Sequence, residues 1–192
     1  VLAALKAAFE FPIGHAAIVF GLFPLPRVKI VRDHLVPEGL LVHGGFVEFM
    51  EGVAEQNLVG LAAGLALEGR VVYLNTIATF LTRRCFEQVA VDLCMHNASV
   101  RLVANGGGVV YAPLGPTHLA TEDIAILRAL PNMTILAPAD AHEMARADRA
   151  TLDHQGPVYV RVAKGHDPVV TTEAGEFRVG RAVPVPHGDD GL

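Results

Sequence analysis

Short runs rich in β-branched residues alternate with segments of helical period through the middle of the chain. The runs that favour strands are residues 70–75, 99–105, 133–139 and 156–162. The segments that favour helices are residues 54–68, 79–97, 117–130 and 140–155. This alternation predicts βαβ units, in which crossover helices join parallel strands and lie against the sheet. The expected fold class is therefore α/β, with a mostly parallel sheet and helices on both faces.

Individual residues predict where several of these helices begin or end. Gly69 follows the helix expected over 54–68 and is a natural C-terminal stop. Pro131 ends the next-to-last helix, because proline cannot continue a helix. Asp140 is the expected N-cap of the helix over 140–155.

The two ends of the sequence carry weaker patterns than the middle. The elements expected near the N-terminus are a helix over 1–9 and short strands near 16–20 and 27–32. The tail after Lys164 is rich in residues typical of linkers and termini, namely Pro168, Pro184, Pro186 and Gly188. We therefore expect one domain over residues 1–165 and a linker over residues 166–192.

The composition indicates a chain that binds a partner protein. Hydrophobic residues make up 52% of the 192 residues and charged residues 18%, against about 25% charged in ordinary soluble proteins. A domain of this size has a limited interior, so part of its apolar surface is expected to contact another chain. An organism whose proteins are rich in alanine and valine would explain the same composition without a partner.

Charge and hydropathy disfavour several other classes of protein. The formal net charge is −5 and Lys and Arg form no run, so nucleic acid is not an expected ligand. No apolar stretch reaches the roughly 18 residues of a membrane span, and the N-terminal segment lacks the basic leader of a signal peptide. Cys85 and Cys94 would fall on opposite faces of one helix, so they cannot bridge each other. Free thiols fit a cytoplasmic protein.

Common ligand-binding and catalytic motifs are absent from the sequence. The glycines of NGGGVVY, Gly106 to Gly108, match neither a P-loop nor a dinucleotide-binding motif. They form either a strand-end turn with positive φ or a place where a ligand approaches the backbone. The nine histidines show no metal-ligand spacing, so no metal site is expected in this chain. There is also no G-x-S-x-G nucleophile motif.

Glu55 lies in the sequence EQN at the start of the helix expected over 54–68. The following turns are rich in glycine and alanine, and Gly60 and Gly64 share a face that another backbone can approach closely. An acidic residue in a first helical turn stabilises the helix dipole, which alone would explain Glu55. The functional alternative is a carboxylate partly buried at a close-packed interface, where it shares a proton with a ligand nitrogen.

Other candidate positions also carry both an ordinary and a functional interpretation. Phe80, Arg83 and Phe86 are spaced three residues apart, as expected of a core stripe or of a wall beside a planar ligand. His118 lies at an expected helix start, where a surface or capping role is the ordinary explanation. Lys164 follows the last expected strand and is solvated in the ordinary case.

Four stretches together resemble the pyrimidine-binding domain of the transketolase family of thiamine-diphosphate enzymes. They are GVAEQNLVGLAAGLALEG, TIATFLTRRCFEQV, GPTHLATEDIAILRALPNMTILAPADAHE and GPVYVRVAKG. They run in the family's order from about residue 46 to residue 165, whereas residues 1–45 match the family poorly. The sequence is more similar to transketolases and deoxyxylulose-phosphate synthases than to the β subunits of 2-oxo-acid dehydrogenases.

The resemblance implies roles for the candidate residues. In this family the glutamate that matches Glu55 hydrogen-bonds a ring nitrogen of the cofactor's aminopyrimidine and works as an acid–base group through the cofactor. Phe80 matches the aromatic residue that packs on the pyrimidine, with Arg83 and Phe86 further along the same wall. His118 matches a histidine that faces the substrate and is the second expected catalytic residue. Lys164 falls where relatives often carry a basic residue for a substrate phosphate.

Two positions depart from the family pattern. Leu114 stands where transketolases usually have an acidic residue, and Gly106 stands where they have a histidine. The family's residues at these places are associated with sugar hydroxyls and with the reacting carbon. The departures therefore argue against an ordinary ketose phosphate and favour a different, less polar donor or acceptor.

The phosphate-binding half of the family's cofactor site is not found in this sequence. The family's diphosphate domain holds Mg²⁺ and the cofactor's phosphates through a G-D-G…N motif, and the third domain would begin about where the sequence stops. The resemblance therefore implies a subunit that works with a separate diphosphate-binding chain, which would hold the Mg²⁺. A heterotetramer with two copies of each chain is the expected assembly.

The leading hypothesis is a split, transketolase-like enzyme that uses thiamine diphosphate to transfer a two-carbon ketol or acyl unit between small molecules. One alternative is a subunit similar to the β subunit of 2-oxo-acid dehydrogenases. The other is a degenerate domain that only binds its partner as a scaffold. The presence of Glu55 argues against the scaffold, while Leu114 and Gly106 argue mildly for it.

Overall fold

The computed structural model describes the backbone of residues 16–21, 40–43, 46–51, 53–164, 167–172 and 175–184. Side chains are described from residue 53 onward within these ranges. The helix expected over 1–9 and the strand expected near 27–32 lie outside the described residues. The strand expected near 16–20 corresponds to β1.

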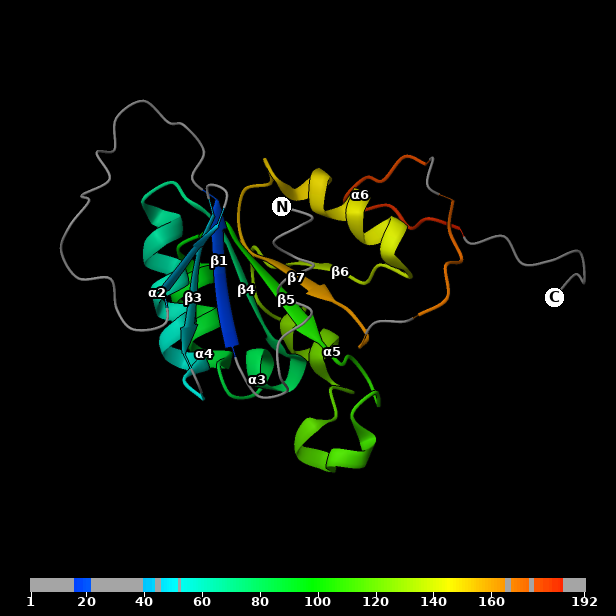
Figure 1. The fold of residues 1–192 in the computed structure, drawn as a ribbon, viewed down its shortest axis with the longest axis horizontal. Helices are drawn as coiled ribbons and strands as arrows, with labels where there is room; N and C mark the ends of the chain where they lie inside the picture. Colours follow the sequence, from blue (N-terminus) through cyan, green and yellow to red (C-terminus); the bar gives the residue numbers. More distant parts are fainter. Residues whose placement is uncertain are drawn as a thin grey trace, which may run out of the picture.

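A seven-stranded sheet forms the centre of the described structure (Figure 1). In chain order the strands are β1 (Ala16–Gly21), β2 (Leu40–His43), β3 (Phe46–Glu51), β4 (Val71–Ile77), β5 (Val100–Asn105), β6 (Thr134–Leu136) and β7 (Val158–Arg161). Their order across the sheet is β2-β3-β1-β4-β5-β7-β6. The last four strands in this order are parallel, and β2, β3 and β1 form an antiparallel edge that joins β4 through β1. The α/β class expected from the sequence is confirmed.

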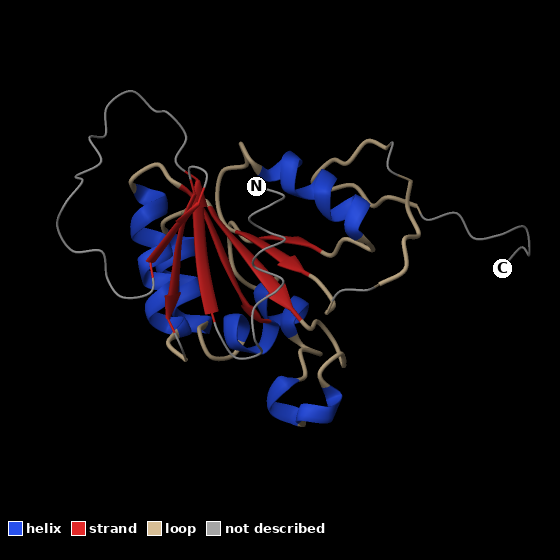
Figure 2. Ribbon diagram, viewed as in Figure 1, coloured by secondary structure: helices blue, strands red, loops and turns tan. Residues whose placement is uncertain are grey.

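Apart from α2, the helices are shorter or more often interrupted than the sequence pattern predicts. The α-helices are α2 (Glu55–Leu67), α3 (Ala78–Thr82), α4 (Phe86–Gln88), α5 (Asp123–Leu127) and α6 (Ala141–Thr151). A π-helical segment spans Val89–Met95, and 3₁₀ turns span Ala112–Leu114 and Pro116–His118. Figure 2 shows helices on both sides of the strands, with α2 to α4 on one side and α6 on the other.

The single helix expected over 79–97 is therefore wrong. It breaks after α3 and resumes as α4, which continues into the π-helical segment. Val89 and Cys94 are both fully buried although they are five residues apart. In an α-helix these two side chains would be separated by about 140°. The wider π turn brings both of them toward the core, so burial overrides the α-helical pattern.

The helix expected over 117–130 is also wrong in extent. A 3₁₀ turn ends at His118, and α5 begins only at Asp123. Between them the backbone N–H and C=O of Ala120 both bond to Gly108, at 2.9 Å each. This pairing takes the backbone groups that a continuous helix would need for its own hydrogen bonds.

Alternation along the parallel strands divides the core between the two faces of the sheet, because successive side chains of a strand point in opposite directions. The α2 face buries Val72, Leu74, Val100, Leu102 and Tyr159, against Leu58, Val59 and Ala62 of α2 and Leu81 of α3. The opposite face buries Leu136, Val158 and Val160 against Ala147 of α6. The two cysteines are free and buried in the first of these clusters.

Polar contacts hold α6 against the face of the sheet on which Ala147 packs. Asp140 is the N-cap of α6, as expected, and its Oδ1 accepts a hydrogen bond from the Glu143 backbone N–H at 2.8 Å. The Tyr73 hydroxyl of β4 donates to Asp148 Oδ1 at 2.6 Å, and burial raises the pKa of both groups. Arg101 of β5 donates to the Thr151 carbonyl in the last turn of α6 and to the Leu152 and His154 carbonyls just beyond it. The orphan carbonyls of a helix end are thus satisfied by a side chain from the sheet.

Candidate functional site

Glu55 lies at the C-terminal edge of the parallel strands. α2 leads into β4 through a turn in which Gly69 has φ of 79°, so the helix runs antiparallel to the strand that it packs against. The first residue of α2 therefore lies near the end of β4, where α3 begins. In α/β sheets this edge is where ligands bind. The Glu55 side chain is only 2% exposed, which a simple surface carboxylate would not be.

The Glu55 carboxylate is paired with Arg84. Arg84 Nη1 donates to Glu55 Oε2 at 2.7 Å, and the Arg84 side chain is 37% exposed. The same guanidinium lies over the Phe80 ring, with Cζ 4.0 Å from the ring centroid. One planar cation thus contacts both the buried carboxylate and the aromatic face.

His118 contacts the same aromatic ring from a different segment. The His118 and Phe80 ring centroids are 5.3 Å apart, with the planes at 68°. Thr117 Oγ1 lies 2.9 Å from His118 Nδ1, a hydrogen bond that fixes the ring orientation and leaves Nε2 for other partners. The structure therefore brings together Glu55, Phe80 and His118, three of the residues singled out in the sequence.

Arg83 connects α3 to the loop that carries His118. Its Nε lies 2.7 Å from Glu122 Oε1, and its Nη2 donates to the backbone carbonyls of Leu119 and Pro116. These contacts span both sides of His118 along the chain. Arg83 therefore holds the histidine loop against α3.

A second arginine holds the same loop from the sheet side. Arg161, at the end of β7, donates through Nε to Asp123 Oδ2 at 2.8 Å and through Nη2 to the Ala120 carbonyl at 3.3 Å. Its side chain passes so close to Gly107 that a Cβ there would lie 2.7 Å from Arg161 Cγ. Of the two interpretations of the triple glycine, the strand-end turn is confirmed, because Gly106 and Gly108 follow β5 with φ of 76° and 72°. The close approach at Gly107 is to a protein side chain.

Two amide side chains lie near the C-terminal ends of the neighbouring strands β4 and β5, Asn75 buried and Asn105 half-buried. Asn105 Nδ2 donates to Asn75 Oδ1 at 2.9 Å, while Asn75 Nδ2 and Asn105 Oδ1 have no partner among the described residues. Thr79 Oγ1, beside Phe80 in α3, is likewise buried without a partner in the described ranges. Unpaired buried polar atoms are costly, so this edge of the sheet has donors and acceptors to offer a ligand or water.

The remaining candidates lie outside this cluster. Phe86 begins α4 after the break and is 37% exposed, and Lys164 Nζ lies 5.7 Å from the Tyr111 ring centroid. In the described part of the chain neither makes a ring contact or ion pair with Glu55, Phe80 or His118. Leu114 is exposed on the first 3₁₀ turn.

Sequence reasoning missed Arg84 and the pair of Arg161 with Asp123. Arg84 lies just beyond Arg83, and the break after α3 decides which of the two arginines reaches Glu55. For Arg161 a signal was available, because an arginine inside the apolar strand run VYVRVA requires a partner when it is buried.

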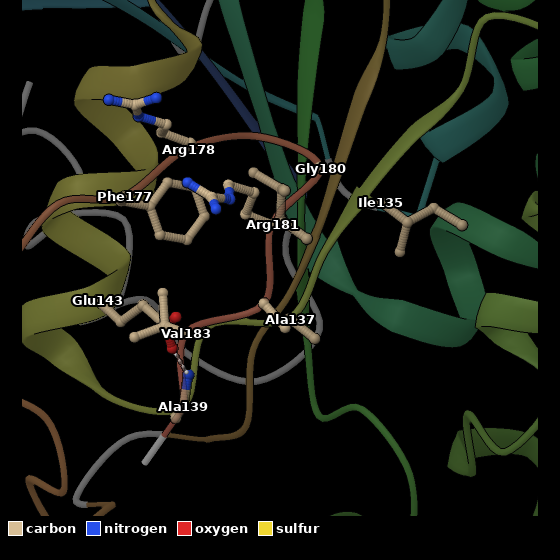
Figure 3. Close-up of a pocket in the computed structure, with 11 residues that line it drawn as sticks. Ile135, Ala137, Ala139, Glu143, Phe177, Arg178, Gly180, Arg181 and Val183 are labelled. Carbon is tan, nitrogen blue, oxygen red and sulfur yellow. Dashed lines mark hydrogen bonds between the residues drawn. The ribbon is translucent and has the colours of Figure 1, made fainter. Parts of the chain in front are cut away.

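A separate pocket of about 380 Å³ lies on the α6 face (Figure 3). It is lined by the end of β6, the start of α6 and the segment 177–183. Glu143 lies on its wall, but its carboxylate already accepts from the Ala139 backbone N–H at 2.6 Å. None of the residues that the sequence singled out for a site lines this pocket.

The described residues contain no cluster of three or more histidine, cysteine or acidic side chains that could hold a metal ion. Among the helices of the described ranges, none is long and apolar enough to cross a membrane.

Comparison with known proteins places the chain in a family. The family described as transketolase, pyrimidine binding domain, matches residues 40–168, well over half of the chain. The chain belongs to this transketolase family. The resemblance expected from the sequence is therefore confirmed, and the parallel part of the sheet with its helices is the fold of a transketolase pyrimidine domain.

Individual relatives agree with this assignment. One of the subunits of apulose-4-phosphate transketolase from Phocaeicola vulgatus is 40% identical over 145 residues, which cover 74% of this chain and 46% of that protein. 1-Deoxy-D-xylulose-5-phosphate synthase 1 of Geobacter sulfurreducens is 36% identical over 190 residues, covering 91% of this chain and 30% of that protein. A solved structure of a split gene transketolase, inactive beta4 tetramer, has a TM-score of 0.64 at 34% identity, covering 74% of this chain and 45% of that chain. The chain spans less than half of the length of each of these proteins.

The transketolase family implies thiamine diphosphate as cofactor, and the described residues fit its pyrimidine half. A buried acceptor, Glu55, and an aromatic face, Phe80, converge on one planar group, the Arg84 guanidinium. An aminopyrimidine is also planar and carries hydrogen-bonding nitrogens. The chemistry of the site therefore suits such a ring.

Proposed function

We propose that this chain is the pyrimidine-domain subunit of a two-chain, transketolase-like enzyme that transfers a two-carbon ketol or acyl unit. The observation that carries the proposal is the convergence of Glu55, Phe80 and His118 at the C-terminal edge of the parallel strands. Bound thiamine diphosphate supplies the carbanion chemistry. The residues of this chain orient the cofactor, hold a proton beside it and face the substrate.

Each residue has a role that its surroundings support. Glu55, buried at the start of α2, accepts the hydrogen bond of a pyrimidine ring nitrogen and holds a proton there. Phe80 supplies the face on which the ring packs. His118, held edge-on to Phe80 with Nδ1 bonded to Thr117, presents Nε2 to the substrate. Arg83 and Phe86 serve the cofactor side of the proposed site, Arg83 by positioning the His118 loop, and Lys164 contacts the substrate.

A diphosphate-binding partner subunit completes the proposed site and holds Mg²⁺. The names of two relatives, one a transketolase subunit and the other a split gene transketolase, support a two-chain enzyme. The α2 face that carries Gly60, Leu61 and Gly64 is exposed, and a Cβ at Gly64 would meet nothing within 4 Å. We propose that this face lies at the partner interface, in a heterotetramer with two copies of each chain.

The substrate is proposed to be a small molecule that differs from ordinary ketose phosphates. Leu114 is exposed on the loop before His118, and Gly106 has φ of 76° with Tyr111 packed against it. Neither position can offer the acidic or imidazole group that the sugar substrates of transketolases meet. The name of the Phocaeicola vulgatus relative supports apulose-4-phosphate as one compound to screen.

The test of the proposal is exchange of the cofactor's C2 proton. The chain is mixed with the diphosphate-binding subunit of a split transketolase, thiamine diphosphate and Mg²⁺, and the exchange is followed by NMR. Glu55→Gln is expected to slow exchange roughly a hundredfold or more while the two chains still assemble. Glu68→Gln, an exposed carboxylate at the other end of α2, is the matched control and is expected to leave exchange unchanged.

Three results would count against the proposal. Exchange at the wild-type rate in Glu55→Gln would show that this carboxylate does not serve the cofactor. No exchange in an assembled wild-type complex would favour the scaffold alternative. Transfer from a 2-oxo acid but not from any ketose would favour the subunit similar to 2-oxo-acid dehydrogenases.

A further inference from the structure

We propose that Arg84 is an internal substitute for the aminopyrimidine ring, and that the cofactor binds by displacing the Arg84 guanidinium from Glu55 and Phe80. This inference rests on the proposed function, because it takes Glu55 and Phe80 as the residues that hold the pyrimidine. It adds a residue that determines cofactor affinity and that the sequence pattern did not single out.

The contacts of Arg84 are those that the ring would need. Its planar guanidinium donates a hydrogen bond to Glu55 Oε2 at 2.7 Å and lies 4.0 Å from the Phe80 ring centroid. The His118 and Phe80 planes are at 68°, so His118 does not stack in parallel on the Phe80 ring. A ring that bonds to Glu55 and packs on the Phe80 ring must occupy the space that the guanidinium fills.

The backbone of Arg84 is fixed, while its side chain can leave. Gln56 Nε2 donates to the Arg84 carbonyl at 3.0 Å, which ties this residue to α2. The side chain is 37% exposed, so a rotamer change carries the guanidinium into solvent without moving the backbone. The displacement therefore requires no rearrangement of α2 or α3.

The pairing explains how Glu55 is tolerated before the cofactor arrives. A carboxylate that is 2% exposed and lacks a counter-charge is strongly destabilising. Arg84 supplies the counter-charge in the cofactor-free subunit. The pairing is expected to weaken binding of the cofactor, because only the fraction of molecules with the guanidinium displaced can bind the ring.

The experiment is an NMR titration of the isotope-labelled chain with hydroxymethylpyrimidine, the free pyrimidine half of thiamine. Wild type is compared with Arg84→Ala and Arg84→Met, the second of which keeps a long side chain without charge. Arg128→Ala, an exposed arginine at the C-cap of α5, is the matched control. Both Arg84 variants are expected to bind the probe roughly threefold to tenfold more tightly than wild type, and Arg128→Ala is expected to bind like wild type.

A second readout follows Arg84 directly. Side-chain protons of Arg84 over the Phe80 ring have resonances shifted by the ring current, and this shift is expected to disappear as the probe saturates the wild-type chain. Equal or weaker binding by both Arg84 variants, or a ring-current shift that persists at saturation, would overturn the proposal.

The titration also separates this inference from the proposed function. If Glu55→Gln abolishes probe binding while Arg84 remains stacked in wild type, the displacement is wrong and the cofactor site stands. If the probe perturbs neither Glu55 nor Phe80 in any variant, the proposed function and the displacement both fail.

Discussion

Nε of Arg161 donates a hydrogen bond to Oδ2 of Asp123 at 2.8 Å, and Asp123 is only 1% exposed. The Tyr159 hydroxyl donates to the same oxygen at 2.9 Å. The pair joins the end of β7 to the start of α5 beneath the loop that carries His118. The stability of this loop is therefore expected to depend on a side chain that does not reach Glu55 or Phe80.

Arg161→Ala is expected to lower the free energy of unfolding by about 2 kcal/mol, because it removes a charged hydrogen bond from a buried carboxylate. Arg161→Lys is expected to lower the free energy of unfolding by less, because it keeps the positive charge and loses only the planar guanidinium. Urea unfolding followed by circular dichroism measures both. A change within about 0.5 kcal/mol for Arg161→Ala, the level of ordinary surface substitutions, would contradict this role.

Two glycine substitutions are expected to change the stability of the chain in opposite directions. Gly64→Ala, in the middle of α2 with open space around it, is expected to stabilise the isolated chain by about 0.5–1 kcal/mol. Gly107→Ala is expected to destabilise it by about 1–3 kcal/mol, because the new methyl group would overlap Arg161. Thermal unfolding of the two variants measures the difference. The double variant Gly107→Ala with Arg161→Ala should lose less than the sum of the single variants, and simple additivity would argue against the contact.

The contribution of Asp140 to stability is expected to depend on pH. Burial acts to raise its pKa, but hydrogen bonds from the Glu143, Thr171 and Val170 backbones and from the Thr171 hydroxyl outweigh it and hold the pKa well below the usual range. The unfolded carboxyl has a pKa of about 3.9, so the folded state binds the proton more weakly. The stabilisation is therefore complete above about pH 4 and is lost as the pH falls through the folded pKa.

Asp140→Ala is accordingly expected to cost about 1–2 kcal/mol at neutral pH, as for other N-cap removals. Asp140→Asn keeps an oxygen that can cap the helix but removes the negative charge. It therefore distinguishes the contribution of the charge from that of the cap. Urea unfolding near pH 7 and near pH 3 should show a smaller gap between wild type and Asp140→Asn at the lower pH, where part of the stabilisation is already lost. A gap that is constant across this range would rule out the charge as its cause.

Both thiols are expected to be unreactive in the folded chain. Burial raises the pKa of Cys85 to about 12 and that of Cys94 to about 11, and neither side chain is exposed. Since the thiolate is the reactive form, a chromogenic disulfide reagent near pH 8 should detect no thiol in native protein and both in guanidinium chloride. Rapid labelling of either cysteine without denaturant would show that its core cluster opens.

The sequence alone was sufficient where structure is determined locally. The parallel strands, α2 and the Asp140 cap all follow from periodicity and capping residues within one segment. The break after α3 and the π-helical segment were not predictable, because they depend on which side chains the sheet and α2 bury. The periodic pattern over 79–97 continues through the break and gives no sign of it.

The candidate site was predictable in part. Arg84 contacts both Glu55 and Phe80, and Phe80 contacts His118. The order of α2, β4 and α3 along the chain explains why Glu55 and Phe80 lie at the same edge of the sheet. Arg84 and the Arg161–Asp123 pair depend on contacts between residues 29 and 38 positions apart, which no single segment encodes. The roles of these residues toward cofactor and substrate are proposals for the experiments above.

The close contact between Gly107 and Arg161 also has an evolutionary consequence. Gly107 has no side chain, and Arg161 occupies the space that a side chain there would fill. A descendant that acquired a larger residue at position 107 would have to shorten position 161, and would then need another counter-charge for Asp123. Among sequences descended from a common ancestor, these three positions are expected to change together.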